Sequence, residues 1–272
     1  MSRVTDQEYL LSEQYQDASN LNARIQLHRR FSVNKYGLPR WVFDQFDFSP
    51  TSRILELGCG PANLWHENLD RVPKGWDSTL SDLSVGMVER ARSNLQSSEH
   101  LFRYEVIDAQ EIPFERGSFD GVIANHMLYH VPDIGRALSE IRRVLRPGGH
   151  FYATTVGEGH MREMNELVSR FVGGDDLWSV ASPKSFLLEN GAELLSRSFS
   201  RVVLRRYEDE LVITEAGPLV AYVQSMMVEE SVLSGERLGE FVGYVDRELA
   251  SKEAIIVTKD TGIFEAVRSD SV

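Results

Sequence analysis

The residues best suited to chemistry in this 272-residue sequence are a carboxylate and two glycines within the stretch 53–64. An apolar run around Glu56 ends abruptly at Gly58, as a buried parallel strand does when it enters a tight turn. Gly58 and Gly60 allow positive φ and a close approach of the backbone to a ligand. The Glu56 carboxylate would repel a pyrophosphate but suits a ligand that carries positive charge. The stretch therefore predicts a strand, a glycine turn and a helix at one end of a ligand site.

A second carboxylate, Asp82, ends the predicted strand 77–82 and follows Gly60 by about 20 residues, as in dinucleotide-binding folds. A carboxylate can accept two hydrogen bonds at once, which suits the hydroxyls of a ribose. The full G-x-G-x-x-G spacing is absent, because no third glycine follows at the required place. Asp82 could instead cap the helix that begins at Ser84.

The elements that must position these residues alternate between strands and helices, which is typical of a doubly wound α/β sheet. The predicted strands cover residues 53–57, 77–82, 101–107, 119–125, 150–155, 199–206 with a continuation at 211–214 after a turn, 254–259 and 263–267. The predicted helices cover residues 20–31, 41–46, 63–69, 84–92, 134–145, 161–171, 186–191, 218–228 and 238–249. Gly191 is predicted to end its helix as a C-cap.

Four ordered motifs over residues 53–155 resemble those of the Rossmann-like (class I) S-adenosylmethionine-dependent methyltransferases. They are Glu56-Leu57-Gly58-Cys59-Gly60-Pro61-Ala62, with alanine at the third glycine; Asp82; Asp108-Ala109 followed by Ile112-Pro113-Phe114 and Ser118-Phe119-Asp120; and the turn Leu145-Arg146-Pro147-Gly148-Gly149. The resemblance implies S-adenosylmethionine as cofactor and S-adenosylhomocysteine as product. It also implies that the Asp108 carboxylate accepts from the adenine amino group and that the Ala109 amide donates to the ring.

The resemblance places the cofactor contacts at the ends of the first four strands. The predicted set is Glu56, Gly58, Cys59, Gly60, Asp82, Leu83, Asp108, Ala109 and Asn125. No metal site is expected. The predicted fold class is a Rossmann-like, doubly wound α/β fold whose seven-stranded, mostly parallel sheet has an antiparallel last strand, with helical N-terminal and inserted cap elements.

The predicted domain organisation has three parts. Residues 1–48 form a helical N-terminal lid, although they could also be a helical extension that only caps the sheet. Residues 49–156 form the cofactor-binding core. Residues 157–272 complete the sheet and include a helical cap at about 157–190 and 214–250.

Methyl transfer is an in-line displacement, so the protein mainly aligns and desolvates two reactants. A base is needed where the acceptor loses a proton, and a histidine with an ordinary pKa of about 6.5 can take that proton near neutrality. His126 is the first candidate, because it follows Asn125 at the end of a strand. Tyr129 and His130 are the next candidates, although a structural role is equally open for each histidine.

Aromatic, methionine and histidine residues outside the cofactor motifs are candidates for an apolar acceptor pocket, with the hydrophobic core as their alternative place. The predicted acceptor set is Tyr15, Trp41, His126, Met127, His160, Met164, Trp178 and Tyr222. The size of the lid and cap favours a small, partly apolar acceptor such as a secondary metabolite.

Composition limits the compartment and the partners. The formal net charge of −12 argues against a broad face for nucleic acid. The single cysteine, Cys59, fits a reducing cytoplasm, and the sequence has neither a signal core nor an apolar run that could span a membrane. We expect a cytoplasmic protein that acts as a monomer or homodimer on a small-molecule acceptor.

Three other functions remain open at this stage. An RNA or protein methyltransferase is the first, although the Asn/Asp-Pro-Pro-Tyr/Phe signature of the tRNA- and DNA-amino enzymes is absent at Asn125-His126-Met127-Leu128. A non-catalytic module that binds S-adenosylmethionine is the second. A nicotinamide oxidoreductase is the third, and Glu56 with Ala62 argues against it. The sequence identifies neither the acceptor nor whether oxygen, nitrogen or carbon is methylated.

Overall fold

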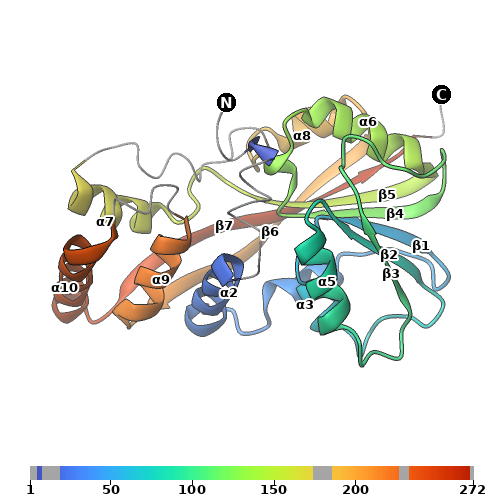
Figure 1. Ribbon diagram of the computed structural model, residues 1–272. Helices are drawn as coiled ribbons and strands as arrows, with labels where there is room; N and C mark the ends of the chain where they lie inside the picture. Colours follow the sequence, from blue (N-terminus) through green and yellow to red (C-terminus); the bar gives the residue numbers. More distant parts are fainter. Residues whose placement is uncertain (1–4, 8–18, 174–185, 227–232, 270–272) are drawn as a thin grey trace.

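The computed structural model describes residues 5–7, 19–173, 186–226 and 233–269. Within these residues, the fold is built on a seven-stranded sheet with the order β3-β2-β1-β4-β5-β7-β6 (Figure 1). The strands are β1 (Arg53–Leu57), β2 (Asp77–Asp82), β3 (Phe102–Val106), β4 (Phe119–Asn125), β5 (Leu145–Val156), β6 (Ser200–Ile213) and β7 (Ile255–Val267). Strands β1 to β5 are parallel, and β7 is antiparallel to both β5 and β6. The predicted fold class is confirmed.

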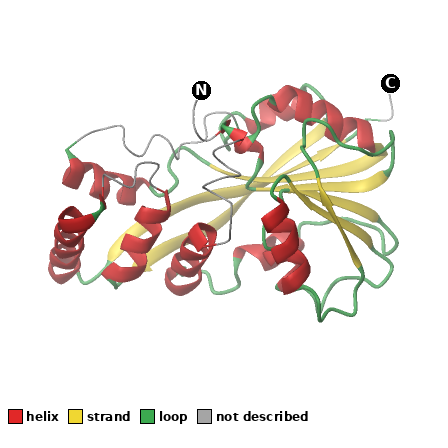
Figure 2. Ribbon diagram, in the orientation of Figure 1, coloured by secondary structure: helices red, strands yellow, loops and turns green. Residues whose placement is uncertain are grey.

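Helices lie on both faces of the sheet (Figure 2). They are α2 (Ser19–Phe31), α3 (Leu38–Phe43), α4 (Asn63–His66), α5 (Val85–Asn94), the 3-10 turn η3 (Leu128–His130), α6 (Ile134–Val144), α7 (Arg162–Val172), α8 (Gly191–Ser196), α9 (Ala216–Met226) and α10 (Gly235–Lys252). The predicted cap of α5 is present, because the Ser84 side chain accepts a hydrogen bond from the Met87 amide.

The core lies on both sides of the central strands. Ile54 and Leu55 are adjacent in β1 and therefore face opposite sides of the sheet, yet both are fully buried. Ile54 packs with residues of α4 and α5, whereas Leu55 packs with residues of α6 and α8. Burial on both faces explains why this strand is apolar without polar alternation.

A further hydrophobic cluster lies where β6 and β7 extend beyond the other strands (Figure 1). Helices α2, α7, α9 and α10 contribute to it, with Leu27 of α2 and Val223 of α9 both fully buried. A helix from the predicted N-terminal lid therefore shares its core with helices of the predicted cap. The amide of Val33 also donates to the Glu210 carbonyl over 2.9 Å, which ties the end of α2 to β6.

Several predicted boundaries were wrong. Gly191 begins α8 instead of ending a helix, and a Cβ there would lie 2.4 Å from the Phe264 ring. Glycine is therefore needed at position 191 because a side chain there would collide with Phe264. Strands β6 and β7 are each continuous, because they pair with one another along nearly their whole length. Helix α4 has only four residues, and β5 begins at Leu145, five residues before the predicted start at His150.

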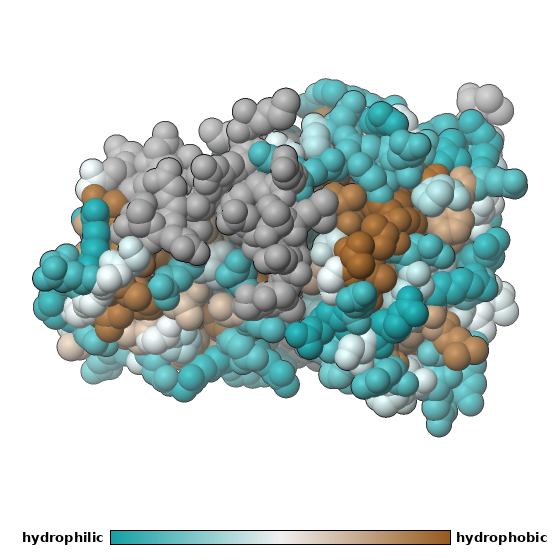
Figure 3. Space-filling model, viewed as in Figure 1, coloured by the Kyte–Doolittle hydropathy of each residue, from teal (hydrophilic) through white to brown (hydrophobic). Residues whose placement is uncertain are grey.

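Hydrophilic residues predominate on the face shown in Figure 3, with a hydrophobic patch in the right half of the view. Among the described residues, no helix is long and apolar enough to cross a membrane.

Candidate functional site

The candidate site lies between β1 and β4, where the order in which successive strands are added to the sheet reverses. Strand β1 pairs with β2 on one side and with β4 on the other, and Leu57 is level with Ala124 of β4. The loops that follow β1 and β4 consequently leave the same edge side by side. Such a switch point is where open α/β sheets bind their ligands.

The glycine turn adopts the backbone that the sequence predicts. Gly58 and Gly60 have φ of 68° and 52°. A Cβ on Gly58 would lie 2.7 Å from the Met127 Cβ, so only glycine fits between the two loops. Ala62, at the position of the third glycine, also has positive φ, at 61°. The turn therefore keeps the left-handed conformation there despite the methyl group, at a cost in strain.

Glu56 is the most deeply buried carboxylate of the site, with an exposed fraction of 1%. It accepts hydrogen bonds from Trp65 Nε1 over 2.6 Å and from Asn125 Nδ2 over 3.0 Å. Burial raises its pKa to about 7, and the two hydrogen bonds oppose part of this shift. A positively charged ligand group would complement the ionised form.

Asp82 is the last residue of β2, and Asp108 follows the neighbouring strand β3 by two residues at the same edge of the sheet. The Asp82 carboxylate accepts from the Gly60 and Ser84 amides, each over 2.9 Å, and so links the glycine turn to α5. Burial raises its pKa. Asp108 accepts from the Gln110 amide over 2.8 Å and from Gln7 Nε2 over 3.1 Å. Gln110 Nε2 also lies 3.1 and 3.2 Å from the two Asp108 oxygens. A ligand at Asp108 would therefore replace a glutamine contact, whereas the Asp82 carboxylate retains acceptor capacity.

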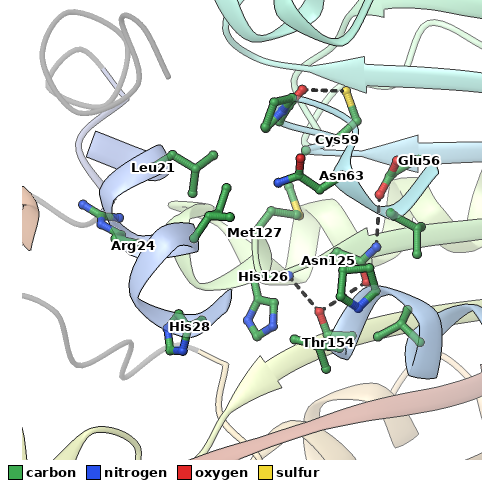
Figure 4. Close-up of a pocket in the computed structure, with 18 of the residues that line it drawn as sticks. Leu21, Arg24, His28, Glu56, Cys59, Asn63, Asn125, His126, Met127 and Thr154 are labelled. Carbon is green, nitrogen blue, oxygen red and sulfur yellow. Dashed lines mark hydrogen bonds between the residues drawn. The ribbon is translucent and has the colours of Figure 1, made fainter. Parts of the chain in front are cut away.

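A cavity of about 1080 Å³ opens at this edge (Figure 4). All the predicted cofactor residues line it: Glu56, Gly58, Cys59, Gly60, Asp82, Leu83, Asp108, Ala109 and Asn125. The predicted catalytic and acceptor residues that line it are His126, Tyr129, His130, Met127, His160 and Tyr222. Both predicted groups therefore share one space.

The remaining predicted acceptor residues lie elsewhere. Trp41 packs against Tyr207, with ring centroids 5.2 Å apart, and Met164 is fully buried in the cluster around α7 and α9. Neither side chain lines the cavity, because Trp41 of α3 packs against β6 and Met164 of α7 packs in the hydrophobic core. Tyr15 and Trp178 lie outside the described residues.

His126 has an unusual backbone for a non-glycine residue, with φ of 50°. Its amide donates to Thr154 Oγ1 over 3.0 Å and to the Thr154 carbonyl over 3.2 Å, which holds this conformation. Burial, with a smaller contribution from the charge of Lys259, lowers the pKa of the imidazole to about 4. His126 is therefore neutral at pH 7 and has a lone pair that can accept a proton.

Tyr129 and His130 form a pair of rings beside His126. Their centroids are 4.6 Å apart, and Tyr129 lies 6.5 Å from the His126 ring. Both residues belong to η3, whose first turn is closed by the His130 amide donating to the Met127 carbonyl. This turn presents the two rings to the cavity.

The cavity residues that sequence reasoning missed include His28 of α2 and Lys259 of β7. His28 stacks on His160, with ring centroids 6.3 Å apart, and Lys259 influences the pKa of His28, His126 and His160. A lysine within the apolar strand 254–259 was the available signal.

The residues of the site can be compared with the chemical groups of S-adenosylmethionine. The buried Glu56 suits the ammonium of the methionine part, and Asp82 suits the ribose hydroxyls. Gly58 lets the turn lie directly against Met127, where a side chain would collide. Asp108 and the Ala109 amide remain at the end of β3 for the adenine. The donor set fits this cofactor.

Comparisons with known proteins agree with this geometry. Residues 55–153 match the model of a methyltransferase domain family. A demethylmenaquinone methyltransferase of Symbiobacterium thermophilum is 35% identical over 109 residues, which are 39% of this chain and 43% of that protein. A highly reducing polyketide synthase of Calcarisporium arbuscula is 30% identical over 129 residues, which are 46% of this chain and 5% of that protein. The chain thus spans less than half the length of either relative.

Among solved structures, the phosphoethanolamine N-methyltransferase 2 of Haemonchus contortus in complex with S-adenosyl-L-methionine has the same fold. Its TM-score is 0.60 at 20% identity, and the match covers 98% of this chain and 60% of that one. The domain match assigns residues 55–153 to a methyltransferase domain, and the chain as a whole shares the Rossmann-like fold of that N-methyltransferase.

Proposed function

We propose that this methyltransferase moves a methyl group to a small, partly apolar molecule held beside the cofactor in the same cavity. One observation supports this most strongly. The carboxylates of Glu56, Asp82 and Asp108, which define the cofactor end of the cavity, and the imidazole of His126 line a single space of about 1080 Å³. The match to a protein named demethylmenaquinone methyltransferase also favours a small-molecule acceptor.

The proposed mechanism depends first on alignment. S-adenosylmethionine, when bound, supplies a methyl group that its sulfonium has already made electrophilic. Glu56, Asp82 and Asp108 would hold the cofactor from three strand ends, while Met127 provides an apolar wall. Alignment of the two reactants, with water excluded, supplies most of the rate enhancement in such a displacement.

His126 is the proposed proton acceptor of the reaction. Its imidazole is neutral at pH 7, because burial holds the pKa at about 4. The same shift makes it a weak base, so it suits an acceptor whose own hydroxyl is acidic. The Thr154 contacts fix the backbone of His126, so that the ring keeps its place while a proton is transferred.

The test is a methyl-transfer assay with methyl-labelled S-adenosylmethionine and a panel of quinols, phenols, carboxylic acids and amines. We expect label in one class of small molecule together with release of S-adenosylhomocysteine. Total RNA and unfolded protein serve as competing substrates in parallel reactions. Label in RNA or protein alone would contradict the proposal, and cofactor binding without label anywhere would favour a non-catalytic module.

A further inference from the structure

The Lys259–Asp209 ion pair is buried next to the cavity, with side-chain exposures of 6% and 0%. Its two members differ in what they face, because Lys259 lines the cavity and Asp209 does not. Asp209 accepts from Lys259, from the Ser32 hydroxyl and from the amides of Asn34 and Glu210, each amide over 2.9 Å. These hydrogen bonds hold the Asp209 carboxylate outside the cavity wall, so that only the positively charged member of the ion pair, Lys259, lines the cavity.

The ammonium of Lys259 has donor capacity left. It donates to Asp209 and lies 3.5 Å from the Ser32 hydroxyl, and these are its hydrogen-bond partners among the described residues. An ammonium has three N–H groups. One donor therefore remains for a group inside the cavity.

Aromatic side chains surround this end of the cavity. His28 stacks on His160 at 6.3 Å and meets Tyr222 edge to face at 5.9 Å. Figure 4 shows His28 on helix α2 on the same side of the cavity as His126. Burial and the charge of Lys259 lower the pKa of His28 to about 3, so His28 is neutral at pH 7. Lys259 is then the charged group at this end.

The charges of the cavity wall are separated along the sequence. Its described acidic residues all come from the segment 56–108, and its described lysines and arginines all come from the segment 24–40 and from β7. The acidic residues are Glu56, Glu67, Asp70, Asp82 and Asp108, and the basic residues are Arg24, Arg29, Lys35, Arg40 and Lys259. A cationic amine would be repelled beside Lys259, whereas an anionic oxygen would be attracted.

We propose that Lys259, with His28 and His160 around it, forms a subsite that binds an anionic oxygen of the methyl acceptor. The ligand class is a carboxylate or the ionised hydroxyl of a phenol or enol. This inference rests on the proposed function, because it assigns the chemistry of the acceptor within the same cavity. Lys259 is here a specificity-determining residue that binds and does not take part in proton transfer.

The experiment compares matched ligand pairs by calorimetry on the whole chain saturated with S-adenosylhomocysteine. The pairs are 3-phenylpropanoate with 3-phenylpropanamide, 4-nitrophenol with 4-nitroanisole, and each anion with 3-phenylpropylamine. We expect at least one anion to bind ten times more tightly than its neutral partner, and the amine to bind least. The carboxylate and phenol arms distinguish the two sources of the oxygen.

The variant is Lys259→Gln combined with Asp209→Asn, because Lys259→Gln alone would leave a buried carboxylate unpaired. We expect it to lose the preference for the anion while it still binds S-adenosylhomocysteine. The control is Lys252→Gln, since Lys252 pairs with Glu248 on the surface of α10 and should keep the preference.

The proposal is overturned if no anion in the panel binds more tightly than its partner, or if the double variant keeps the preference. Failure of the proposed function looks different. In that case S-adenosylhomocysteine does not bind or no small molecule is methylated, while the preference for an anion can still be measured without cofactor.

Discussion

The side-chain amide of Asn125 donates to the Glu56 carboxylate over 3.0 Å, across the boundary between β4 and β1. The Asn125 oxygen accepts in turn from Thr154 Oγ1 over 3.3 Å, and Thr154 accepts from the His126 amide. One series of hydrogen bonds therefore joins the carboxylate of the cofactor end to the backbone of the proposed base (Figure 4). The positions of both groups depend on the same three strands.

Replacement of Asn125 should disturb the cofactor end through Glu56. In Asn125→Ala, the buried carboxylate keeps only the Trp65 donor, so we expect a loss of about 1–3 kcal/mol in the free energy of unfolding. Affinity for S-adenosylhomocysteine should fall as well. Denaturant unfolding and calorimetry measure the two effects. The control is Asn190→Ala, which removes a hydrogen bond to the Leu187 amide away from the cavity and should change stability alone.

Gly58→Ala should abolish cofactor binding. The new methyl group would lie 2.7 Å from the Met127 Cβ at a residue with φ of 68°, so the two loops must separate. Gly117→Ala is the matched control, because Gly117 has φ of 72° but its nearest atom would be 3.8 Å away. Both variants should lose about 1–2 kcal/mol of stability from backbone strain. Equal cofactor affinity in the two variants would show that the close approach of the loops is unimportant.

Cofactor affinity should depend on pH through Glu56. Its pKa is about 7 in the free protein, and a bound ammonium favours the ionised carboxylate. Below pH 7 the carboxyl must first lose its proton, so affinity for S-adenosylhomocysteine should fall by up to about tenfold per pH unit. Calorimetry from pH 5.5 to pH 8 measures this slope. Glu56→Gln should bind weakly with little pH dependence, and an unchanged slope in that variant would exclude Glu56 as its source.

His126 should make the fold sensitive to acid. Its pKa is about 4 in the folded chain against an ordinary value of 6.5, so the unfolded chain binds more protons between these two values. Stability is therefore lost as pH falls from 6.5 towards 4. Relative to pH 8, His126→Asn should reduce this loss by up to about 2 kcal/mol at pH 5, measured by urea unfolding. An identical pH profile for the variant and the wild type would contradict the burial of a neutral imidazole.

The same residue should affect turnover and not cofactor affinity. His126→Ala removes the proposed proton acceptor but leaves Glu56, Asp82 and Asp108 in place. We expect turnover to fall by about 10²-fold or more, as removal of a general base does. The dissociation constant of S-adenosylhomocysteine should change less than threefold. Unchanged turnover would remove His126 from the mechanism.

The cofactor end could be predicted from the sequence because each of its residues belongs to a short motif at the end of a strand. Gly58, Asp82 and Asp108 each lie at the end of a strand or within two residues of it, and parallel strands bring such ends together. The other end could not be predicted in this way. His28 and Lys259 meet only because α2 shares a core with α9 and lies beside β6, and no short-range pattern records that packing. Gly191 was misread for a similar reason, since its constraint comes from Phe264, far along the chain.

The most direct test of the central claim is a calorimetric titration of the protein with S-adenosylhomocysteine, alongside the double variant Glu56→Ala, Asp82→Ala. The cavity geometry predicts micromolar binding by the natural sequence and a loss of at least 100-fold in the double variant, with both proteins folded. Absence of binding to the folded natural chain, or equal binding by both proteins, would contradict the placement of the cofactor at the ends of β1 and β2.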